Sequence, residues 1–244
     1  MTGAVVVIPL YNEAPTVVQV LREVREAVPT ADILVVDDGS TDRSAGILAV
    51  EQAGDPRLRV VTHRENQGYG QALIDGFAVA LRGDYAAVVT IDCDAQHEPR
   101  QIPEFLAALA EADLVSGSRY LDPAAGGDPA PADRVAINRE TVARLREVTG
   151  YDLTDAWCGF KAYRADALRR LRLTEPGYGM PLQVWVQAAR LGLRMKELPV
   201  PRVYKNPARR FWGGLDDPET RRRYYQAVLD AELAGAGRAG GRSA

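Results

Sequence analysis

Short apolar runs alternate with segments of helical periodicity through the first half of the chain. Five of these runs are rich in Val, Ile and Leu and end within a few residues, at 4–9, 33–36, 58–62, 86–91 and 114–116. Between the first two runs, apolar residues recur at helical spacing, as at Val17, Val20, Leu21 and Val24. Strands that alternate with helices predict an α/β fold with a mainly parallel, doubly wound sheet and helices on both faces.

Polar residues follow four of the predicted strands at the point where each strand ends. They are 11–13, Asp37 with Asp38, 92–96, and Ser118 with Arg119. Doubly wound sheets bind ligands at the carboxyl ends of their strands, which all meet at one edge. We therefore expect one continuous site along that edge.

The run at 86–91 ends in Asp92, Cys93 and Asp94. Two carboxylates one residue apart converge on one cation if the chain turns between them. Mg²⁺ and Mn²⁺ prefer such oxygen ligands and keep positions open for substrate phosphates. The alternative is a turn with two solvated aspartates that bind no cation. The residues around the pair distinguish these two interpretations.

Those residues, IDCDAQHEP at 91–99, resemble the metal-binding DxDxQHxP segment of family 2 glycosyltransferases. They are most similar to the branch of polyprenyl-phosphate (dolichol-phosphate) mannose synthases. The resemblance implies a GT-A-like fold, the fold of nucleotide-diphospho-sugar transferases. It also implies that Asp92, Asp94 and Gln96 surround the metal and the donor diphosphate, with Cys93 beside the donor.

Two earlier segments resemble the same family on the nucleotide side. IPLYNE at 8–13 implies that Pro9, Tyr11 and Glu13 line the nucleotide, and VVDDGSTD at 35–42 implies that Asp37 and Asp38 contact the nucleoside. An ordinary loop and helix capping by residues 40–42 stay open as alternatives. The glycine-rich segment 66–77 also matches, with backbone packing as the stronger explanation.

Several cations are candidates for binding phosphate. GSRY at 117–120 resembles the family, and Arg119 at a strand end would neutralise phosphate charge. Arg134 and Arg139 are candidates for an acceptor phosphate, with solvated helix positions as the alternative. Three further cations, near the end of the resemblance, are candidates for binding the donor diphosphate: Arg202, Lys205 and Arg209. The segment after Tyr204 departs from the family pattern.

The segment 177–185 bears on the acceptor. Many inverting relatives carry an acidic base there, and this chain has Gln183 at or near that position. A sugar hydroxyl needs a base to attack, whereas a phosphate oxygen is already ionised. Gln183 therefore predicts a phosphate acceptor.

Composition limits the remaining choices. A formal net charge of −3 does not suggest a nucleic-acid partner, and two cysteines are too few for a disulfide framework. No apolar run approaches the roughly 20 residues of a spanning helix. We therefore expect a cytoplasmic protein with at most peripheral contact at the membrane face. A single domain is expected over 1–234, with a nucleotide-sugar half at 1–120, an acceptor half at 121–234 and a disordered tail at 235–244.

The sequence thus predicts an inverting glycosyltransferase that depends on Mg²⁺ or Mn²⁺. Mannose from GDP-mannose is the first expectation, with glucose or another sugar from a UDP-sugar next, and polyprenyl phosphate is the expected acceptor. Transfer to a soluble small molecule is one alternative. A non-catalytic nucleotide-sugar-binding protein is the other, with Trp157, Phe211 and Trp212 on a partner surface, although the pair Asp92 and Asp94 argues against it. A homo-oligomer also stays open.

Overall fold

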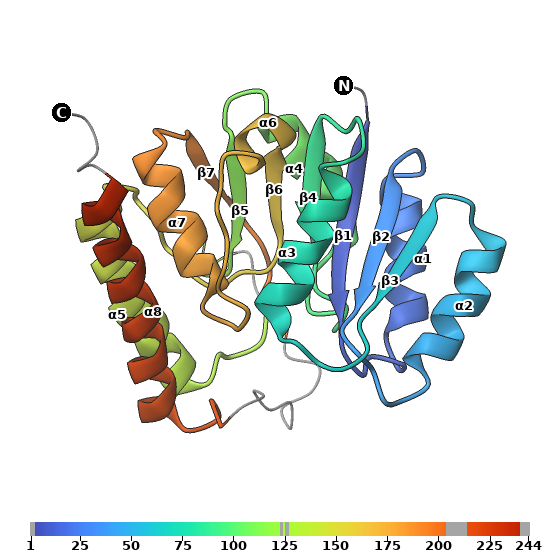
Figure 1. The fold of residues 1–244 in the computed structure, drawn as a ribbon, viewed down its shortest axis with the longest axis horizontal. Coiled ribbons are helices and arrows are strands. Elements are labelled where there is room, and N and C mark those ends of the chain that lie inside the picture. Colours follow the sequence, from blue (N-terminus) through green and yellow to red (C-terminus); the bar gives the residue numbers. More distant parts are fainter. Residues whose placement is uncertain (1–2, 123, 125–126, 204–213, 240–244) are drawn as a thin grey trace.

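A seven-stranded sheet forms the centre of the protein (Figure 1). The computed structural model describes residues 3–122, 124, 127–203 and 214–239. The strand order is β3-β2-β1-β4-β6-β5-β7. The strands are β1 (Ala4–Leu10), β2 (Asp32–Asp37), β3 (Leu58–Thr62), β4 (Ala87–Thr90), β5 (Leu114–Ser118), β6 (Lys161–Arg164) and β7 (Met195–Pro199).

Among the described strands, only β6 runs against its neighbours. It pairs antiparallel with β4 and β5, whereas the pairs β1–β2, β1–β4, β2–β3 and β5–β7 are parallel. The prediction of a mainly parallel sheet is confirmed. The parallel strands place their carboxyl ends together at the lower edge in Figure 1.

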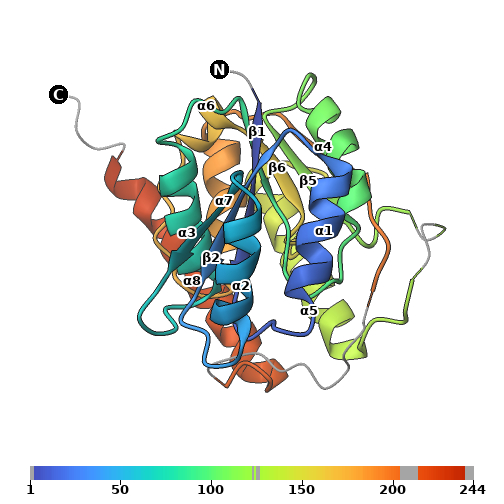
Figure 2. The same cartoon turned by 90° about the vertical axis from the view of Figure 1, so that its right-hand side faces the viewer.

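Helices cover both faces of the sheet, as predicted. Figure 2 shows α3 and α7 on one side of the strands and α1 and α4 on the other. The helices are α1 (Val17–Ala27), α2 (Ser44–Gly54), α3 (Tyr69–Ala80), α4 (Ile102–Ala108), α5 (Ala132–Thr149), α6 (Ala165–Leu168), α7 (Met180–Arg190) and α8 (Pro218–Ala239), with a short 3₁₀ turn η1 (Pro99–Gln101). None of these described helices is long and apolar enough to cross a membrane.

The sequence of β1 is apolar throughout because both faces of this strand are buried. Val6 and Ile8 pack into the cluster beneath α1 and α4, and Val5 and Val7 pack into the cluster beneath α3 and α7. A strand buried on both faces has no polar side, so it reads as a continuous apolar run. Each fully buried Val or Ile contributes roughly 1.5–3 kcal/mol, which makes this strand the centre of the core.

The last helix, α8, packs on α5 and α7 at the outer side of the sheet (Figure 1). It continues to Ala239 and so overlaps the first residues of the tail at 235–244, whose disorder stays a prediction. Alanine has the highest helix propensity, and the alanines at 234, 236 and 239 favour this continuation over coil. Residues 240–244 lie outside the described part of the chain.

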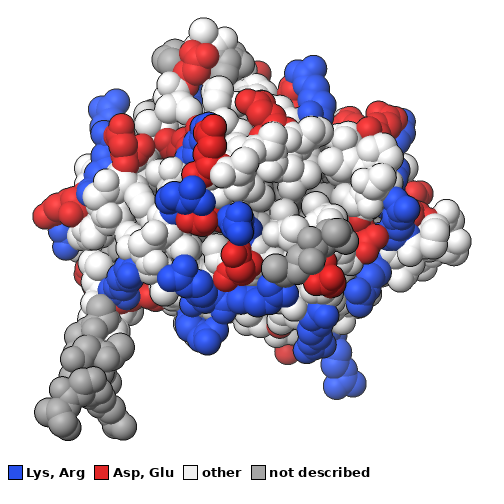
Figure 3. Space-filling view, turned by 90° about the horizontal axis from the view of Figure 1, so that it is seen from above, with Lys and Arg blue, Asp and Glu red and all other residues white. Residues whose placement is uncertain are grey.

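The edge of the sheet opposite the strand carboxyl ends carries mixed charges. Figure 3 shows acidic and basic side chains interspersed on this face. Arg194 pairs with Asp113 at 3.1 Å and Lys196 with Glu111 at 2.8 Å. Exposed pairs of this kind contribute little to stability.

Candidate active site

A hollow opens at the carboxyl edge of the sheet. Its lining comes from the segments after β4, after β5, before β6 and after β7. Because β6 runs in the opposite direction, its preceding residues reach the same edge at which the parallel strands end. The lining residues are Asp92, Asp94, Gln96, His97, Arg119, Trp157, Gly159 and Val203. The fold therefore brings together four residues that the sequence singled out: Asp92, Asp94, Gln96 and Arg119.

Asp92 is held from two sides. The Tyr69 hydroxyl donates to its Oδ1 at 3.0 Å, and Nε2 of His97 lies 3.1 Å from its Oδ2. Burial, together with the neighbouring carboxylate, raises the pKa of Tyr69, which keeps its hydroxyl protonated as a donor. A Cβ on Gly159 would lie 2.3 Å from Asp92 Oδ2, so only glycine leaves room for this carboxylate.

A tight turn directs Asp94 into the same hollow. Ala95 has a positive φ of 55°, and the Gln96 N–H donates to Asp94 Oδ1 at 3.0 Å. Cys93, between the two aspartates, points into the apolar core and is only 3% exposed. The Cys93 side chain is thus directed away from the hollow, which leaves its backbone for the predicted donor contact.

The donor set fits a divalent cation of the Mg²⁺ or Mn²⁺ type. Asp92, Asp94 and Gln96 line one hollow, and carboxylate and amide oxygens are the ligands that such cations prefer. In the described ranges, no group of three or more His, Cys, Asp and Glu residues could hold a metal alone.

Arg119 lines the same hollow as the two aspartates and is fixed by Asp155. Its Nε and Nη2 donate to the two carboxylate oxygens of Asp155 at 2.7 and 3.0 Å, and its backbone N–H donates at 3.1 Å. Asp155 is fully buried. Burial by itself would raise the pKa of Asp155, but the Arg119 guanidinium and the hydrogen bonds outweigh it and lower that pKa.

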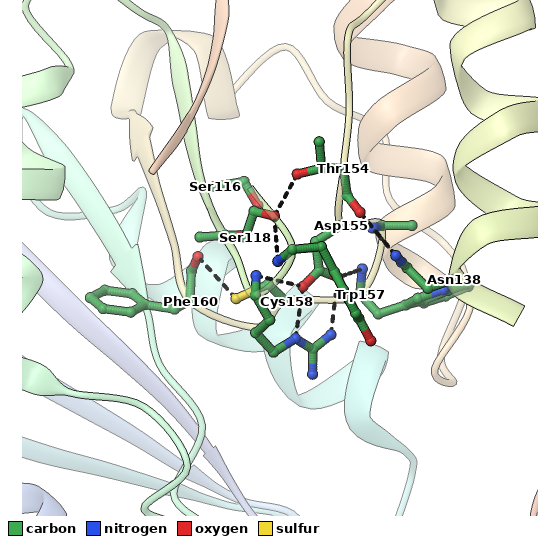
Figure 4. Close-up of polar contacts among 12 residues, drawn as sticks. Ser116, Ser118, Asn138, Thr154, Asp155, Trp157, Cys158 and Phe160 are labelled. Atoms are coloured by element: carbon green, nitrogen blue, oxygen red, sulfur yellow. Dashed lines mark hydrogen bonds and ion pairs between the residues drawn. The ribbon is translucent and has the colours of Figure 1, made fainter. Parts of the chain in front are cut away.

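A further carboxylate holds the segment that carries Asp155. Glu197 of β7 accepts hydrogen bonds from the backbone N–H and hydroxyl of Thr154 at 2.9 and 2.7 Å, and from the Asp155 N–H at 3.0 Å. Figure 4 shows Thr154 also contacting Ser118, the residue before Arg119, at 2.5 Å. Desolvation raises the pKa of Glu197. The sequence analysis did not identify Glu197, a single acidic residue in a short strand.

Lys161 lies behind the hollow, where it is buried. Its ammonium donates to Ser116 Oγ at 3.0 Å and to the carbonyl of Cys158, and desolvation lowers its pKa. Lys161 therefore anchors the backbone next to Gly159, the residue that abuts Asp92. Burial raises the pKa of the Cys158 thiol to about 12, so this thiol is not a nucleophile.

The loop after β1 is tied to the loop after β2. Asn12 has a positive φ of 56°, and its Oδ1 accepts from the backbone N–H groups of Thr41 and Asp42 at 2.8 and 3.2 Å. Pro9 is buried within β1, and Tyr11 and Glu13 are partly buried beside Asn12. These residues sit at neighbouring strand ends but do not line the hollow, so their contact with a nucleotide stays a prediction.

Asp37 and Asp38 are both buried at the end of β2. Asp37 accepts from the Ser40 N–H at 3.0 Å, and its Oδ2 has no hydrogen-bond partner among the described residues. Asp38 contacts His63 Nδ1 at 2.7 Å and accepts from the N–H groups of Gln67 and Gly68, both at 2.9 Å. Asp38 thus organises the loop before α3, and the nucleoside contact of both residues stays a prediction.

Replacing Asp38 by Asn should destabilise the protein by about 1–3 kcal/mol, because an amide NH₂ would then face backbone donors in a buried position. Urea unfolding measures this loss. Asp152→Asn is the matched control, since the Asp152 side chain is 93% exposed and pairs only at the surface with Arg146. An unchanged free energy of unfolding in the Asp38 variant would contradict this role.

Gln183 has a structural role rather than a position in the hollow. Its Oε1 accepts from the N–H groups of Thr174 and Glu175, both at 2.8 Å. Its Nε2 donates to Thr174 Oγ1 and to Glu232 of α8, at 3.1 and 2.8 Å. The amide is used in joining α7, the preceding loop and α8, so the inference from Gln183 to the acceptor loses its support.

The other predicted cations lie on several different segments of the chain. Arg202 follows β7, and its guanidinium lies 5.8 Å from the Tyr120 ring centre, which Arg119 approaches to 6.0 Å. Arg134 and Arg139 are on α5 and do not line the hollow, and Arg139 is exposed. Lys205 and Arg209 lie outside the described residues. Their contacts with phosphate stay predictions.

The start of α8 is rich in arginine and tyrosine at 221–225 and packs close to the hollow. Arg221 pairs with Asp133 at the start of α5. The Tyr225 ring stacks on Trp157, with ring centres 3.9 Å apart. Trp157 was a candidate for a partner surface in the non-catalytic alternative. In the structure it lines the hollow and is covered by Tyr225 of α8.

The chain is similar to known proteins over most of its length. Residues 5–172 match the sequence pattern of Glycosyl transferase family 2. The chain is 38% identical over 199 residues to an undecaprenyl-phosphate mannosyltransferase of Micrococcus luteus, covering 80% of this chain and 81% of that protein. It is 34% identical over 203 residues to a polyprenol monophosphomannose synthase of Mycolicibacterium smegmatis, covering 80% and 75%.

Among solved structures, glucosyl-3-phosphoglycerate synthase of Mycobacterium tuberculosis, in a complex with Mn²⁺, UDP-glucose and phosphoglyceric acid, has the same fold. The TM-score is 0.72 at 24% identity, covering 95% of this chain and 80% of that one. That similarity shows the GT-A fold, as predicted. With the family match over more than half of its length, the chain is a glycosyltransferase and belongs to glycosyl transferase family 2.

Proposed function

We propose that this glycosyltransferase transfers mannose from GDP-mannose to polyprenyl phosphate at a membrane surface. The observation that carries the proposal is the hollow itself. Asp92, Asp94, Gln96 and Arg119 line it together, a set of side chains that suits a cation and phosphate groups. The acceptor and the sugar come from the relatives, which are named for mannose transfer to undecaprenyl phosphate and polyprenol phosphate.

The residues of the hollow would divide the work as follows. Asp92, Asp94 and Gln96 would hold Mg²⁺ or Mn²⁺, which when bound neutralises charge on the departing diphosphate. Arg119, aligned by Asp155, would donate to a phosphate oxygen in a partly dehydrated site where such a bond is strong. The acceptor oxygen would attack the anomeric carbon from the face opposite the diphosphate, with inversion.

The lining also favours an acceptor that is already ionised. In the described part of the chain, the only acids that line the hollow are Asp92 and Asp94, and both belong to the proposed cation site. A hydroxyl acceptor would need another base, whereas a phosphate monoester carries its negative charge at neutral pH.

Product analysis tests the proposal. Labelled GDP-mannose and UDP-glucose would each be incubated with a polyprenyl phosphate or the matched polyprenol, in Mn²⁺, Mg²⁺ or EDTA. We expect mannosyl transfer to the lipid phosphate only, and none in EDTA. Transfer to the alcohol but not the phosphate would contradict the acceptor class. A robust transfer from UDP-glucose alone would contradict the donor.

A further inference from the structure

Tyr69, the first residue of α3, makes a contact that the proposed reaction does not yet use. Its hydroxyl donates to Asp92 Oδ1 at 3.0 Å, and its ring stacks on Tyr178 with centres 5.6 Å apart and planes inclined by 16°. A carboxylate at the end of a strand can rotate about two side-chain bonds. The buried Tyr69 hydroxyl on Oδ1 and His97 Nε2 on Oδ2 restrict that rotation, and a carboxylate with about four acceptor sites can bind a further ligand as well.

The loop before α7 seats this end of α3. The Gln71 N–H donates to the Pro176 carbonyl at 2.9 Å. A Cβ on Gly68 would lie 2.5 Å from that carbonyl oxygen, and a Cβ on Gly70 would lie 2.3 Å from the carbonyl oxygen of Glu175. The glycines on either side of Tyr69 therefore allow two backbones to touch, which fixes where the Tyr69 ring can lie.

Helix α8 in turn holds that loop. The Tyr224 hydroxyl donates to Glu175 Oε1 at 2.6 Å and accepts from the Gly179 N–H at 3.0 Å. The same Glu175 oxygen accepts from the Gly177 N–H at 2.9 Å. The loop is thus fixed by a side chain from α8, which lies beyond the family match at 5–172.

We infer that Tyr69 is a positioning residue for the Asp92 carboxylate, and that α8 keeps Tyr69 in place through Tyr224. The inference rests on the proposed function, in which Asp92 holds a divalent cation. Groups that orient a metal ligand change metal affinity by about 10- to 100-fold when they are removed. The C-terminal helix would then contribute to the cation site without touching it.

The test measures Mn²⁺ affinity rather than turnover. Mn²⁺ would be titrated into the full chain in the presence of GDP, and in a separate experiment in the presence of UDP. Electron paramagnetic resonance would measure the free Mn²⁺ at each step. Tyr69→Phe keeps the ring and its stack on Tyr178 but removes the hydroxyl. We expect about tenfold weaker Mn²⁺ binding in this variant, with a cooperative melting transition retained in the absence of ligands.

Tyr85→Phe is the matched control. Tyr85 also donates its hydroxyl to a carboxylate, that of Asp32, at the start of β2 and therefore at the opposite edge of the sheet. Its removal should leave Mn²⁺ affinity unchanged. A Tyr69 variant that binds Mn²⁺ as tightly as the parent protein would overturn the positioning role.

Tyr224→Phe tests the part played by α8, and it also serves if the Tyr69 variant fails to fold. Loss of its bonds to the loop should weaken Mn²⁺ binding about threefold. Because both residues act by one route, the double variant should bind no more weakly than Tyr69→Phe alone. Effects that multiply, or no effect of Tyr224→Phe, would overturn the role of α8.

The two levels of failure are distinguishable. If the parent protein binds no Mn²⁺ with either nucleotide, the cation site of the proposed function is wrong, and the inference falls with it. If the parent protein binds Mn²⁺ and the Tyr69 variant matches it, only the inference is wrong.

Discussion

Asp94→Asn should reduce the rate of sugar transfer at saturating donor and Mn²⁺ by about a hundredfold or more. A cation at a departing diphosphate supplies several kcal/mol of stabilisation, and each 1.36 kcal/mol corresponds to a factor of ten in rate. The amide removes the negative charge that holds the cation but keeps the size of the side chain. Asp92→Asn should act in the same direction with a smaller effect, because the amide oxygen can still accept from the Tyr69 hydroxyl while the amide NH₂ faces His97 Nε2, so the side chain stays in place.

Glu98→Gln is the control for this prediction. Glu98 lies in the same loop, and its carboxylate pairs with Arg100 at the surface. That substitution removes the same charge a few residues away and should leave the rate within about twofold, as exposed pairs contribute little. All three variants should retain a cooperative melting transition in EDTA. An Asp94 variant with near-parent turnover would remove Asp94 from the cation site.

The fold could be predicted because its signals are local in the sequence. Residues 4–9 and 33–36 are apolar throughout, since both faces of their strands are buried, and Val17 to Val24 mark one face of α1. The ends of parallel strands meet at one edge, so the convergence of 92–96 and Arg119 followed from topology. The extension of α8 to Ala239 was missed because glycines among the alanines weaken the local helix signal.

The residues that hold the site in place were not predictable in the same way. Asp155 is 36 residues from Arg119, and Glu197 is 43 residues from Thr154. No periodicity encodes a contact between such distant positions. The resemblance of the segment 177–185 to relatives identified the position of Gln183 but not the direction of its side chain. Helix α7 is buried on nearly all sides, so an amide there bonds to its neighbours rather than to a ligand.

The pair Arg119 and Asp155 leads to the second large effect. Arg119→Ala leaves the fully buried Asp155 carboxylate without its guanidinium, and such losses cost 3–5 kcal/mol. Arg119 is itself 21% exposed, so we expect the lower end, about 3 kcal/mol. For a chain of this size that corresponds to a melting temperature roughly 6–12 °C lower.

The pH dependence of that loss identifies its cause. In the parent protein the pKa of Asp155 lies below its usual 3.8, so its contribution to stability is present above about pH 4 and lost as the pH falls further. Without Arg119, burial would raise that pKa, and the ionised carboxylate would destabilise the folded state at neutral pH. The difference in melting temperature should therefore be largest near pH 7 and shrink toward pH 4. Glu197 and Lys161, the charged groups nearby, are the same in both proteins.

Arg119→Lys separates charge from geometry. Lysine keeps a positive charge beside Asp155 but cannot donate the two parallel bonds of the guanidinium, so it should recover most of the stability. It should not recover activity, because the phosphate donor would no longer be fixed in direction, and we expect both variants to be about a hundredfold slower in sugar transfer. A lysine variant that is both stable and fully active would show that Arg119 acts only as a charge. An alanine variant whose melting temperature differs equally at pH 4 and pH 7 would contradict the assignment of the loss to Asp155.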